Sequence, residues 1–329
     1  LYVFNLVLLV ILKTGLGQNN KGATRWLEIG GFQFQPTEIA KIILIVFFAM
    51  FLMKHEDDLN TAKTIFKAIG LLLLPLALVI SQPDLKNTIT ITVVFCAMMY
   101  LAGLSYKVIG GVLAVAIPLI LLLLFLITQT DFQLPEPLDS TIGYQLDRIR
   151  TWNDPDAEEN SNGAIQQNNS ITAIGSGQLT GKGLNNNKVS SANKGNFVAE
   201  IHNDFIFAVA GEELGFIGCC AIILILSLIV FQCIRIGRRA KDEAGMLIAC
   251  GVGTLVAFQS FLNIGVATGI LPNTGTTLPF VSYGLTSLWT FFIGMGLVLN
   301  VGLQNRNFVT RNDELLRRKT VYEHRIHRT

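Results

Sequence analysis

The sequence contains few charged residues for its length. Only 15% of its 329 residues are charged, whereas soluble domains carry roughly 25%. Hydrophobic residues make up 51% of the chain, and the mean hydropathy is +0.50. They occur in long blocks, comparable to the ~20 residues that a helix needs to cross a bilayer. This composition excludes an ordinary soluble protein and predicts an all-α, polytopic bundle of membrane helices.

Cysteine is also scarce, and the net charge is only +2. All of the cysteines lie in apolar blocks, which excludes a disulfide framework and a cysteine-based metal site. We interpret them as small packing residues. The weak net charge gives no indication of nucleic-acid binding. The cysteines are Cys96, Cys219, Cys220, Cys233 and Cys250.

We expect the sequence to begin inside a longer protein, because it starts at Leu1 rather than Met and is apolar from the outset. About eight spans are predicted, at residues 2–16, 37–53, 66–81, 88–104, 107–127, 205–233, 244–270 and 283–303. A break at 82–87 separates the third and fourth spans, and Pro83 bends the chain there. Irregular backbone at membrane depth is tolerated where it lines a cavity or is buried in protein. The break is therefore either a candidate site or a plain extracellular turn.

Lysine and arginine gather in the loops after spans two, four and six and in the C-terminal tail. If the spans alternate in direction, all of these segments share one side, which is then cytoplasmic. The loop 128–204 lies outside, and its ten acidic against five basic residues agree with that placement. The predicted organisation is 1–127 with five spans, 128–204 as the large extracellular loop, 205–304 with three spans and 305–329 as a basic cytoplasmic tail.

The loop 128–204 is rich in Asn, Ser and Gly, which favours turns and partial disorder. Within it, Ile142, Leu146, Ile149 and Trp152 recur at helical spacing, with Arg148 nearby. This pattern predicts a short amphipathic helix that lies on the outer leaflet.

Two pairs of ionisable residues fall inside predicted spans. Glu38 and Lys41 are three residues apart and share a helix face just after the helix start at Pro36. Glu212 and Glu213 lie within the sixth span. Ionisable groups inside spans are energetically expensive and usually functional. The alternative for Glu38 and Lys41 is a self-neutralising pair near the membrane interface.

A glycine-rich stretch at 175–183 resembles a phosphate-binding loop but fails its spacing. Ser176 stands where the first Gly is required, and Gly183 replaces the Ser or Thr. A loop that offers backbone N–H groups and Lys182 to an anion remains open.

The segment Glu200-Ile201-His202-Asn203-Asp204 directly precedes a long apolar span. If the segment is extended, Glu200, His202 and Asp204 point the same way and could hold a metal. Asp204 could instead cap the following helix. A carboxylate at the mouth of a cavity can also act as a general base. Further on, the Pro- and Gly-rich stretch 271–284 predicts an ordered re-entrant or capping loop.

Several of these strings together resemble the SEDS family of bacterial cell-wall polymerases, typified by RodA and FtsW, and slightly more RodA than FtsW. They occur in family order from about residue 22 to residue 304. The matching strings are Gly22 to Trp26, Gln35-Pro36-Thr37-Glu38 with Lys41, Gln82 to Leu85, Gly175 to Leu184, Glu200 to Phe207 with Glu212 to Gly215, and Thr274 to Gly284.

The family has ten spans, so the resemblance implies that the first two are missing here. The chain departs from the family pattern at three places. Lys86 stands where the family has Gly after Gln-Pro-Asp-Leu, and Asn203 replaces the Thr of His-Thr-Asp. The family's Ser-Tyr-Gly-Gly-Ser-Ser is Ser282-Tyr283-Gly284-Leu285-Thr286-Ser287. These departures put loop packing in question more than chemistry.

The resemblance implies peptidoglycan glycosyl transfer with lipid II as both donor and acceptor, outside the bacterial cytoplasmic membrane. Asp204 matches the family's essential aspartate and is the expected catalytic base. A divalent cation, Mg²⁺ or Mn²⁺, is a further candidate for stabilising the leaving pyrophosphate, and a class B penicillin-binding protein is the expected partner. The expected substrate-binding residues are Arg25, Trp26, Glu38, Lys41, Asp84, Arg148, Lys182, Glu200 and His202.

Two other functions are consistent with the sequence. A lipid II flippase would use the same intramembrane charges for transport without forming a bond. A non-catalytic scaffold for a transpeptidase would tolerate replacement of those charges.

Overall fold

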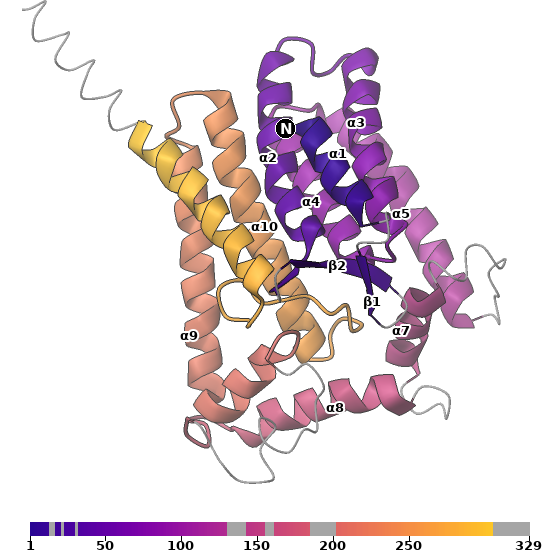
Figure 1. Cartoon of the computed structure of the whole chain (residues 1–329), viewed down its shortest axis with the longest axis vertical. Coiled ribbons are helices and arrows are strands. Elements are labelled where there is room, and N and C mark those ends of the chain that lie inside the picture. Colours follow the sequence, from indigo (N-terminus) through magenta and orange to yellow (C-terminus); the bar gives the residue numbers. More distant parts are fainter. Residues whose placement is uncertain are drawn as a thin grey trace, which may run out of the picture.

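The computed structural model describes residues 1–12, 17–20, 23–29, 32–129, 143–154, 161–184 and 202–304. In these residues the apolar helices follow the order of the eight predicted spans, which confirms the helical membrane bundle (Figure 1). Five are long enough to cross a membrane: α2 (Pro36–Lys54), α3 (Ala62–Ile80), α9 (Ile206–Gly237), α10 (Glu243–Ala267) and a C-terminal helix (Leu285–Gln304). Three further helices are α1 (Tyr2–Ile11), α4 (Leu85–Leu101) and α5 (Tyr106–Gln129).

The starts of the long helices follow from local sequence. Pro36 begins α2, where its missing N–H costs nothing. The side chains of Thr61, Asp84 and Asp242 accept hydrogen bonds from the first-turn N–H groups of α3, α4 and α10. The break at residues 82–87 therefore contains the N-cap of α4.

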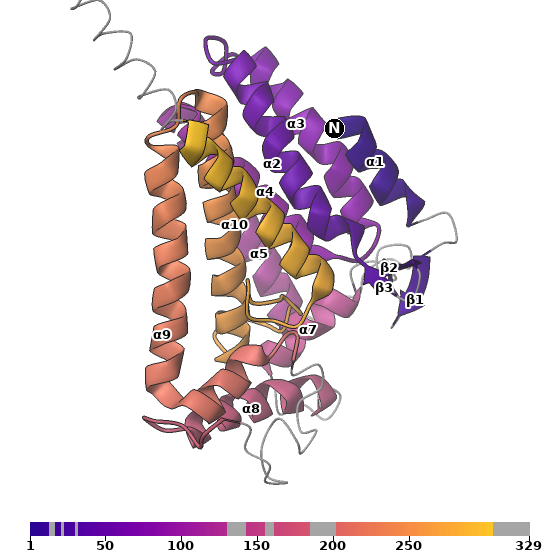
Figure 2. The ribbon, with the colours of Figure 1, turned by 60° about the vertical axis from the view of Figure 1, so that its left-hand side comes forward.

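Helix α10 occupies the centre of the bundle and packs against α2, α4 and α9 (Figure 2). The core around it contains large side chains that are at most 2% exposed, such as Phe48 of α2, Met98 of α4 and Leu255 of α10 itself. Apolar side chains on the outer faces of α5 and α9, such as Val115 and Phe231, are more than half exposed. Such an exposed apolar surface matches a helix that faces lipid.

A small antiparallel sheet joins α1 to α2, and the sequence pattern does not predict it. Strands β1 (Gly17–Asn20), β2 (Ala23–Ile29) and β3 (Phe32–Phe34) pair in the order β1-β2-β3. Leu27 is buried while Glu28 is exposed, so β2 presents one side to the protein.

The large loop contains two helices in its described parts, α7 (Tyr144–Asn153) and α8 (Ser161–Ser176). The prediction of a short helix around Leu146 and Trp152 agrees with α7. The prediction of turns was wrong for 161–176. The buried face of α8 is formed largely by small and polar residues such as Ala164, Gln167 and Ser170, whose spacing leaves no apolar stripe to recognise.

Helix α9 is broken at Gly215, which has φ +67° and ψ −166°. The segment that follows α8 fills the break: Phe216 N–H donates to the Gln178 carbonyl, and Lys182 N–H donates to the Glu212 carbonyl. Backbone groups freed at membrane depth must find partners within the protein. The glycine-rich stretch therefore stabilises the break in α9 through backbone hydrogen bonds, in addition to any binding role. We call this contact the clamp.

This close contact predicts that alanine destabilises the protein at one glycine of this stretch and is tolerated at another. A Cβ on Gly177 would lie 1.9 Å from the Gly211 carbonyl oxygen, whereas a Cβ on Gly175 would meet nothing within 4 Å. Gly177→Ala should therefore destabilise the protein by about 1–3 kcal/mol through overpacking. Thermal unfolding in detergent micelles measures this effect, and Gly175→Ala is the matched control. Equal melting temperatures for the two variants would contradict the clamp.

Candidate active site

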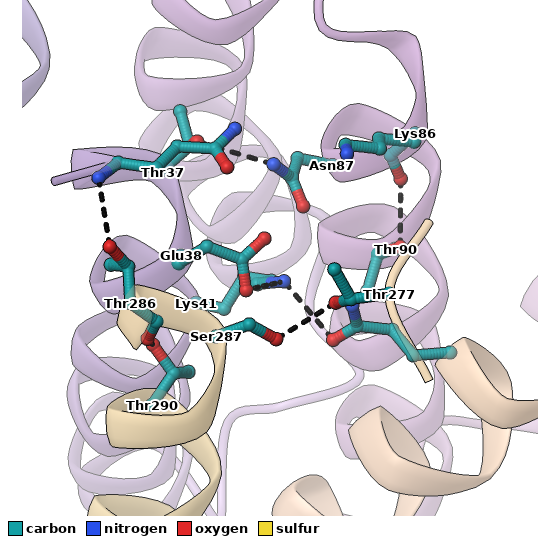
Figure 3. Close-up of polar contacts among 12 residues, drawn as sticks. Thr37, Glu38, Lys41, Lys86, Asn87, Thr90, Thr277, Thr286, Ser287 and Thr290 are labelled. Carbon is teal, nitrogen blue, oxygen red and sulfur yellow. Dashed lines mark hydrogen bonds and ion pairs between the residues drawn. The ribbon is translucent and has the colours of Figure 1, made fainter. Parts of the chain in front are cut away.

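A buried ion pair lies at the centre of the bundle. Lys41 Nζ is 2.9 Å from Glu38 Oε2 and 3.1 Å from Gln259 Oε1 on α10. Both charged residues are less than 5% exposed. Figure 3 shows Glu38 and Lys41 pointing toward each other, with Thr277 and Ser287 close by. The interpretation of Glu38 and Lys41 as a pair that neutralises itself thus agrees with the geometry, and both side chains are buried in the first two turns of α2.

A second buried polar group surrounds Asp84. Its Oδ2 accepts hydrogen bonds from Gln35 Nε2 at 3.2 Å, Thr37 Oγ1 at 3.4 Å and Asn87 Nδ2 at 2.8 Å. Its Oδ1 accepts from the Asn87 N–H. Asp84 is fully buried. These contacts tie the start of α4 to the start of α2, and they give Asp84 a structural role beside the proposed binding role.

The backbone before α9 is held in place by the loop that follows α10. Asn263 Nδ2 donates to the Asp204 carbonyl at 2.8 Å and to the Thr276 carbonyl at 2.6 Å. Ser282 Oγ donates to the Asn203 carbonyl at 2.6 Å, and the Tyr283 N–H donates to the His202 carbonyl at 2.9 Å. Each of three successive carbonyls is thus fixed by a different residue, which sets the position of Asp204.

Three charged side chains converge on Gly275. A Cβ built on Gly275 would lie 3.1 Å from Asp204 Oδ2 and 3.7 Å from Arg148 Nη1. Arg148 Nη1 also donates to the Asn273 carbonyl at 2.8 Å. Lys86 Nζ donates to the carbonyl of Gly275 itself. Gly275 has φ +69°, which favours glycine, and the absent side chain leaves the space between Asp204 and Arg148 open.

Two predictions about the segment before α9 were wrong. Residues 202–205 form a turn, so His202 and Asp204 do not alternate along an extended strand. The N-cap of α9 is Phe205, without a side-chain cap bond, so Asp204 does not cap the helix.

The proposed metal triad is not assembled in the described part of the chain. Glu200 lies outside the described residues, and no group of three His, Cys, Asp or Glu side chains suited to a metal occurs among the residues that are described. His202 is exposed. A divalent cation remains a prediction of the resemblance.

The remaining predicted cations lie away from Asp204 or are engaged elsewhere. Lys182 Nζ forms a 2.8 Å ion pair with Glu212, whose side chain is 2% exposed. Arg25 lies in β2, with its side chain outside the described part of the structure, and Trp26 beside it is half-buried. Of the basic residues proposed from the sequence, the described contacts bring only Arg148 together with Asp204.

The departures from the expected motif leave the packing intact. Thr286 Oγ1 accepts from the Gln35 N–H at 3.2 Å, and Ser287 Oγ contacts Thr277 Oγ1 at 2.8 Å, so both hydroxyls bridge separate elements. Lys86, which contacts the Gly275 carbonyl beside Asp204, is a residue that the motifs did not mark. Its only signal in the sequence was the replacement of a glycine by a base beside Asp84.

The model of the family described as "Cell cycle protein", FtsW/RodA/SpoVE, matches residues 1–307. The chain belongs to this family. Probable peptidoglycan glycosyltransferase FtsW of Geobacter metallireducens is 36% identical over 297 residues, which cover 90% of this chain and 74% of the relative. The corresponding protein of Haemophilus influenzae is 32% identical over 312 residues, which cover 94% of this chain and 74% of the relative.

Two solved structures share the fold of this FtsW/RodA/SpoVE chain. One, described as structural coordination of polymerization and crosslinking by a peptidoglycan synthase complex, has a TM-score of 0.70 at 24% identity. The matched region covers 92% of this chain and 80% of the chain in that structure. The rod shape determining protein RodA of Thermus thermophilus has a TM-score of 0.60 at 24% identity. The matched region covers 92% of this chain and 77% of the RodA chain.

Because Glu38 and Lys41 form a buried ion pair in this FtsW/RodA/SpoVE chain, we expect the effects of replacing them on the free energy of unfolding to be strongly non-additive. Lys41→Met leaves a buried carboxylate without its cation and should cost about 3–5 kcal/mol of stability. Adding Glu38→Gln removes that charge and should recover most of the loss. Thermal unfolding of the purified protein measures both effects.

The control for this cycle is Lys54→Met, which removes an exposed lysine at the end of the same helix and should be near neutral. A double variant no more stable than Lys41→Met would show that the ion pair does not account for the cost.

Proposed function

We propose that this chain is a peptidoglycan glycosyltransferase that joins lipid II molecules at the outer face of the bacterial cytoplasmic membrane. The observation that carries the proposal is the convergence of Asp204 and Arg148 on Gly275, with the backbone carbonyl of Asp204 held by Asn263. Family membership and the names of the curated relatives support the same activity.

The reaction needs a base for the acceptor sugar. The 4-hydroxyl of the acceptor GlcNAc is a weak nucleophile at neutral pH, and a carboxylate within hydrogen-bond reach accepts its proton as the new bond forms. We assign this role to Asp204, which is half-buried and therefore partly exposed to solvent. A fixed backbone keeps the carboxylate where the hydroxyl must lie.

The leaving group needs positive charge. The acceptor oxygen attacks the anomeric carbon of the donor MurNAc, the bond to pyrophosphate breaks, and undecaprenyl pyrophosphate departs. No covalent intermediate is required, so the anomeric configuration inverts. Cations in a low-dielectric setting stabilise the negative charge that develops on the pyrophosphate. Arg148, beside the same glycine as Asp204, is placed to do this.

Sidedness and partner are parts of the proposal. The basic residues of the loops after α2, α4 and α9 support a cytoplasmic location for those ends. The end of the bundle that carries α7 and α8 then faces outward (Figure 1). Asp204 lies just before α9, at the start of that helix. A similar fold occurs in a solved peptidoglycan synthase complex, which supports a class B penicillin-binding protein as partner.

A lipid II flippase is the second candidate, favoured by the buried Glu38–Lys41–Gln259 contacts at membrane depth. Purified protein reconstituted with lipid II separates the two functions. Formation of glycan chains supports the polymerase, whereas movement of lipid II across the bilayer without polymer supports the flippase. Activity that survives replacement of every site charge would indicate a scaffold.

Asp204→Asn should abolish glycan formation, because the amide cannot accept the proton, while membrane insertion and melting temperature stay close to wild type. Gel analysis of products from labelled lipid II measures the activity. The substitution keeps the shape of the side chain and the backbone bond to Asn263. Wild-type quantities of glycan from the correctly folded variant would remove Asp204 from the mechanism.

Arg148→Ala should lower the polymerisation rate roughly 10- to 100-fold, the loss expected for one charge-assisted contact to a phosphate. Arg150→Ala is the matched control, because Arg150 lies on the same helix and forms its ion pair with Asp147 at 3.5 Å. Similar rates for the two variants would indicate that Arg148 is not a donor-binding residue.

A further inference from the structure

Lys86 lies in the first turn of α4 and reaches across to the loop that follows α10. Its ammonium donates to the Gly275 carbonyl, 189 residues further along the chain. An ammonium group has three N–H donors, so this one contact leaves it with further capacity. The residue is half-buried, follows the buried Asp84 by two positions, and contacts the same glycine that lies beside Asp204.

Two positive features of the protein lie close to the Lys86 ammonium. A positive charge in the first turn of a helix lies at the positive end of the helix dipole. Lys41 is a like-charged neighbour, and the oxygens of Asp84 accept hydrogen bonds from Gln35, Thr37 and Asn87. Within the described part of the chain, no carboxylate forms an ion pair with Lys86. A bound anion would balance this charge.

The other lysines near the centre do not supply a free cation to a ligand. Lys41 is 3% exposed and bound to Glu38 and Gln259, and Lys182 is bound to Glu212. Lys86 and Arg148, by contrast, both contact the stretch Asn273 to Gly275, and Asp204 lies beside the same glycine. Two cations and one carboxylate thus surround a single backbone position.

We propose that Lys86 binds the pyrophosphate of the lipid-linked donor, together with Arg148, at the Gly275 carbonyl. This inference rests on the proposed glycosyltransferase function. Two cations on one side of the reacting carbon hold the leaving group, while Asp204 accepts the proton of the attacking hydroxyl. The glycine that the family has at this position supplies no such charge, so the contact is specific to chains with a base here.

The test compares Lys86→Gln with Lys86→Arg in the full chain reconstituted with lipid II. Glutamine keeps a hydrogen-bond donor for the Gly275 carbonyl but removes the charge, whereas arginine keeps the charge. Lys86→Gln should lower kcat/KM about tenfold, and Lys86→Arg should restore most of it. Lys107→Gln is the matched control, an exposed lysine at the opposite end of the bundle.

A second measurement reports on the pyrophosphate directly. Undecaprenyl pyrophosphate, the released product, should inhibit the Lys86→Gln variant about tenfold less well than wild type. Inhibition by undecaprenyl monophosphate should change much less. A residue that only holds the loop would not alter this preference for the pyrophosphate over the monophosphate.

The outcomes distinguish this inference from the function on which it rests. If wild-type protein forms no glycan, the proposed function fails. If wild type polymerises and Lys86→Gln matches it in rate and in product inhibition, only the role of Lys86 is overturned. Equal losses in Lys86→Gln and Lys86→Arg, with lowered melting temperatures, would also overturn it, because they would show a purely structural role.

Discussion

One side-chain amide holds the candidate site together. Asn263 of α10 donates hydrogen bonds to the Asp204 carbonyl at 2.8 Å and to the Thr276 carbonyl at 2.6 Å. It is fully buried, so these bonds have little competition from water. A rigid central helix thereby fixes two segments that are otherwise irregular: the turn that carries Asp204 and the loop that carries Gly275.

The same need to satisfy backbone polar groups explains the other irregular regions. At membrane depth an unpaired N–H or C=O costs several kcal/mol, so every break in a helix requires partners from the protein. The break in α9 at Gly215 is filled by residues 177–183. At the start of α4, Asp84 accepts from the Asn87 N–H, and the nearby Gln82 Nε2 donates to the Leu9 carbonyl in the last turn of α1. Both sets of hydrogen bonds use backbone groups or polar side chains. Both also lie next to charged residues in the interior of the bundle. Breaks and charges occur together because the same polar surroundings stabilise both.

Much of the bundle could be predicted because hydrophobic length is read directly from sequence. Blocks such as 37–53 and 244–270 correspond to α2 and α10 with small differences at their ends. Helix α8 and the small sheet were missed for a physical reason. In α8, Gln167 and Ser170 are buried by donating to the carbonyls of residues 266, 267 and 271, so burial there follows hydrogen bonding and not hydrophobicity. No periodic pattern records that kind of burial.

The types of residue in the candidate site could be predicted from the sequence, but most of the contacts that they make with one another could not. The sequence marked Lys41, Arg148 and Lys182 as cations for the substrate. It offered the Glu38–Lys41 ion pair as an alternative, because the two residues are three apart, but it gave no indication that Glu212 pairs with Lys182. The position of Lys86 depends on a contact between residues 86 and 275, which no local pattern encodes. Charge inside a membrane protein is costly whether it is used for packing or for chemistry. A partly buried cation becomes a candidate for substrate binding when the folded protein leaves it near the proposed catalytic carboxylate without an ion pair of its own. Among the described lysines, Lys86 meets that condition.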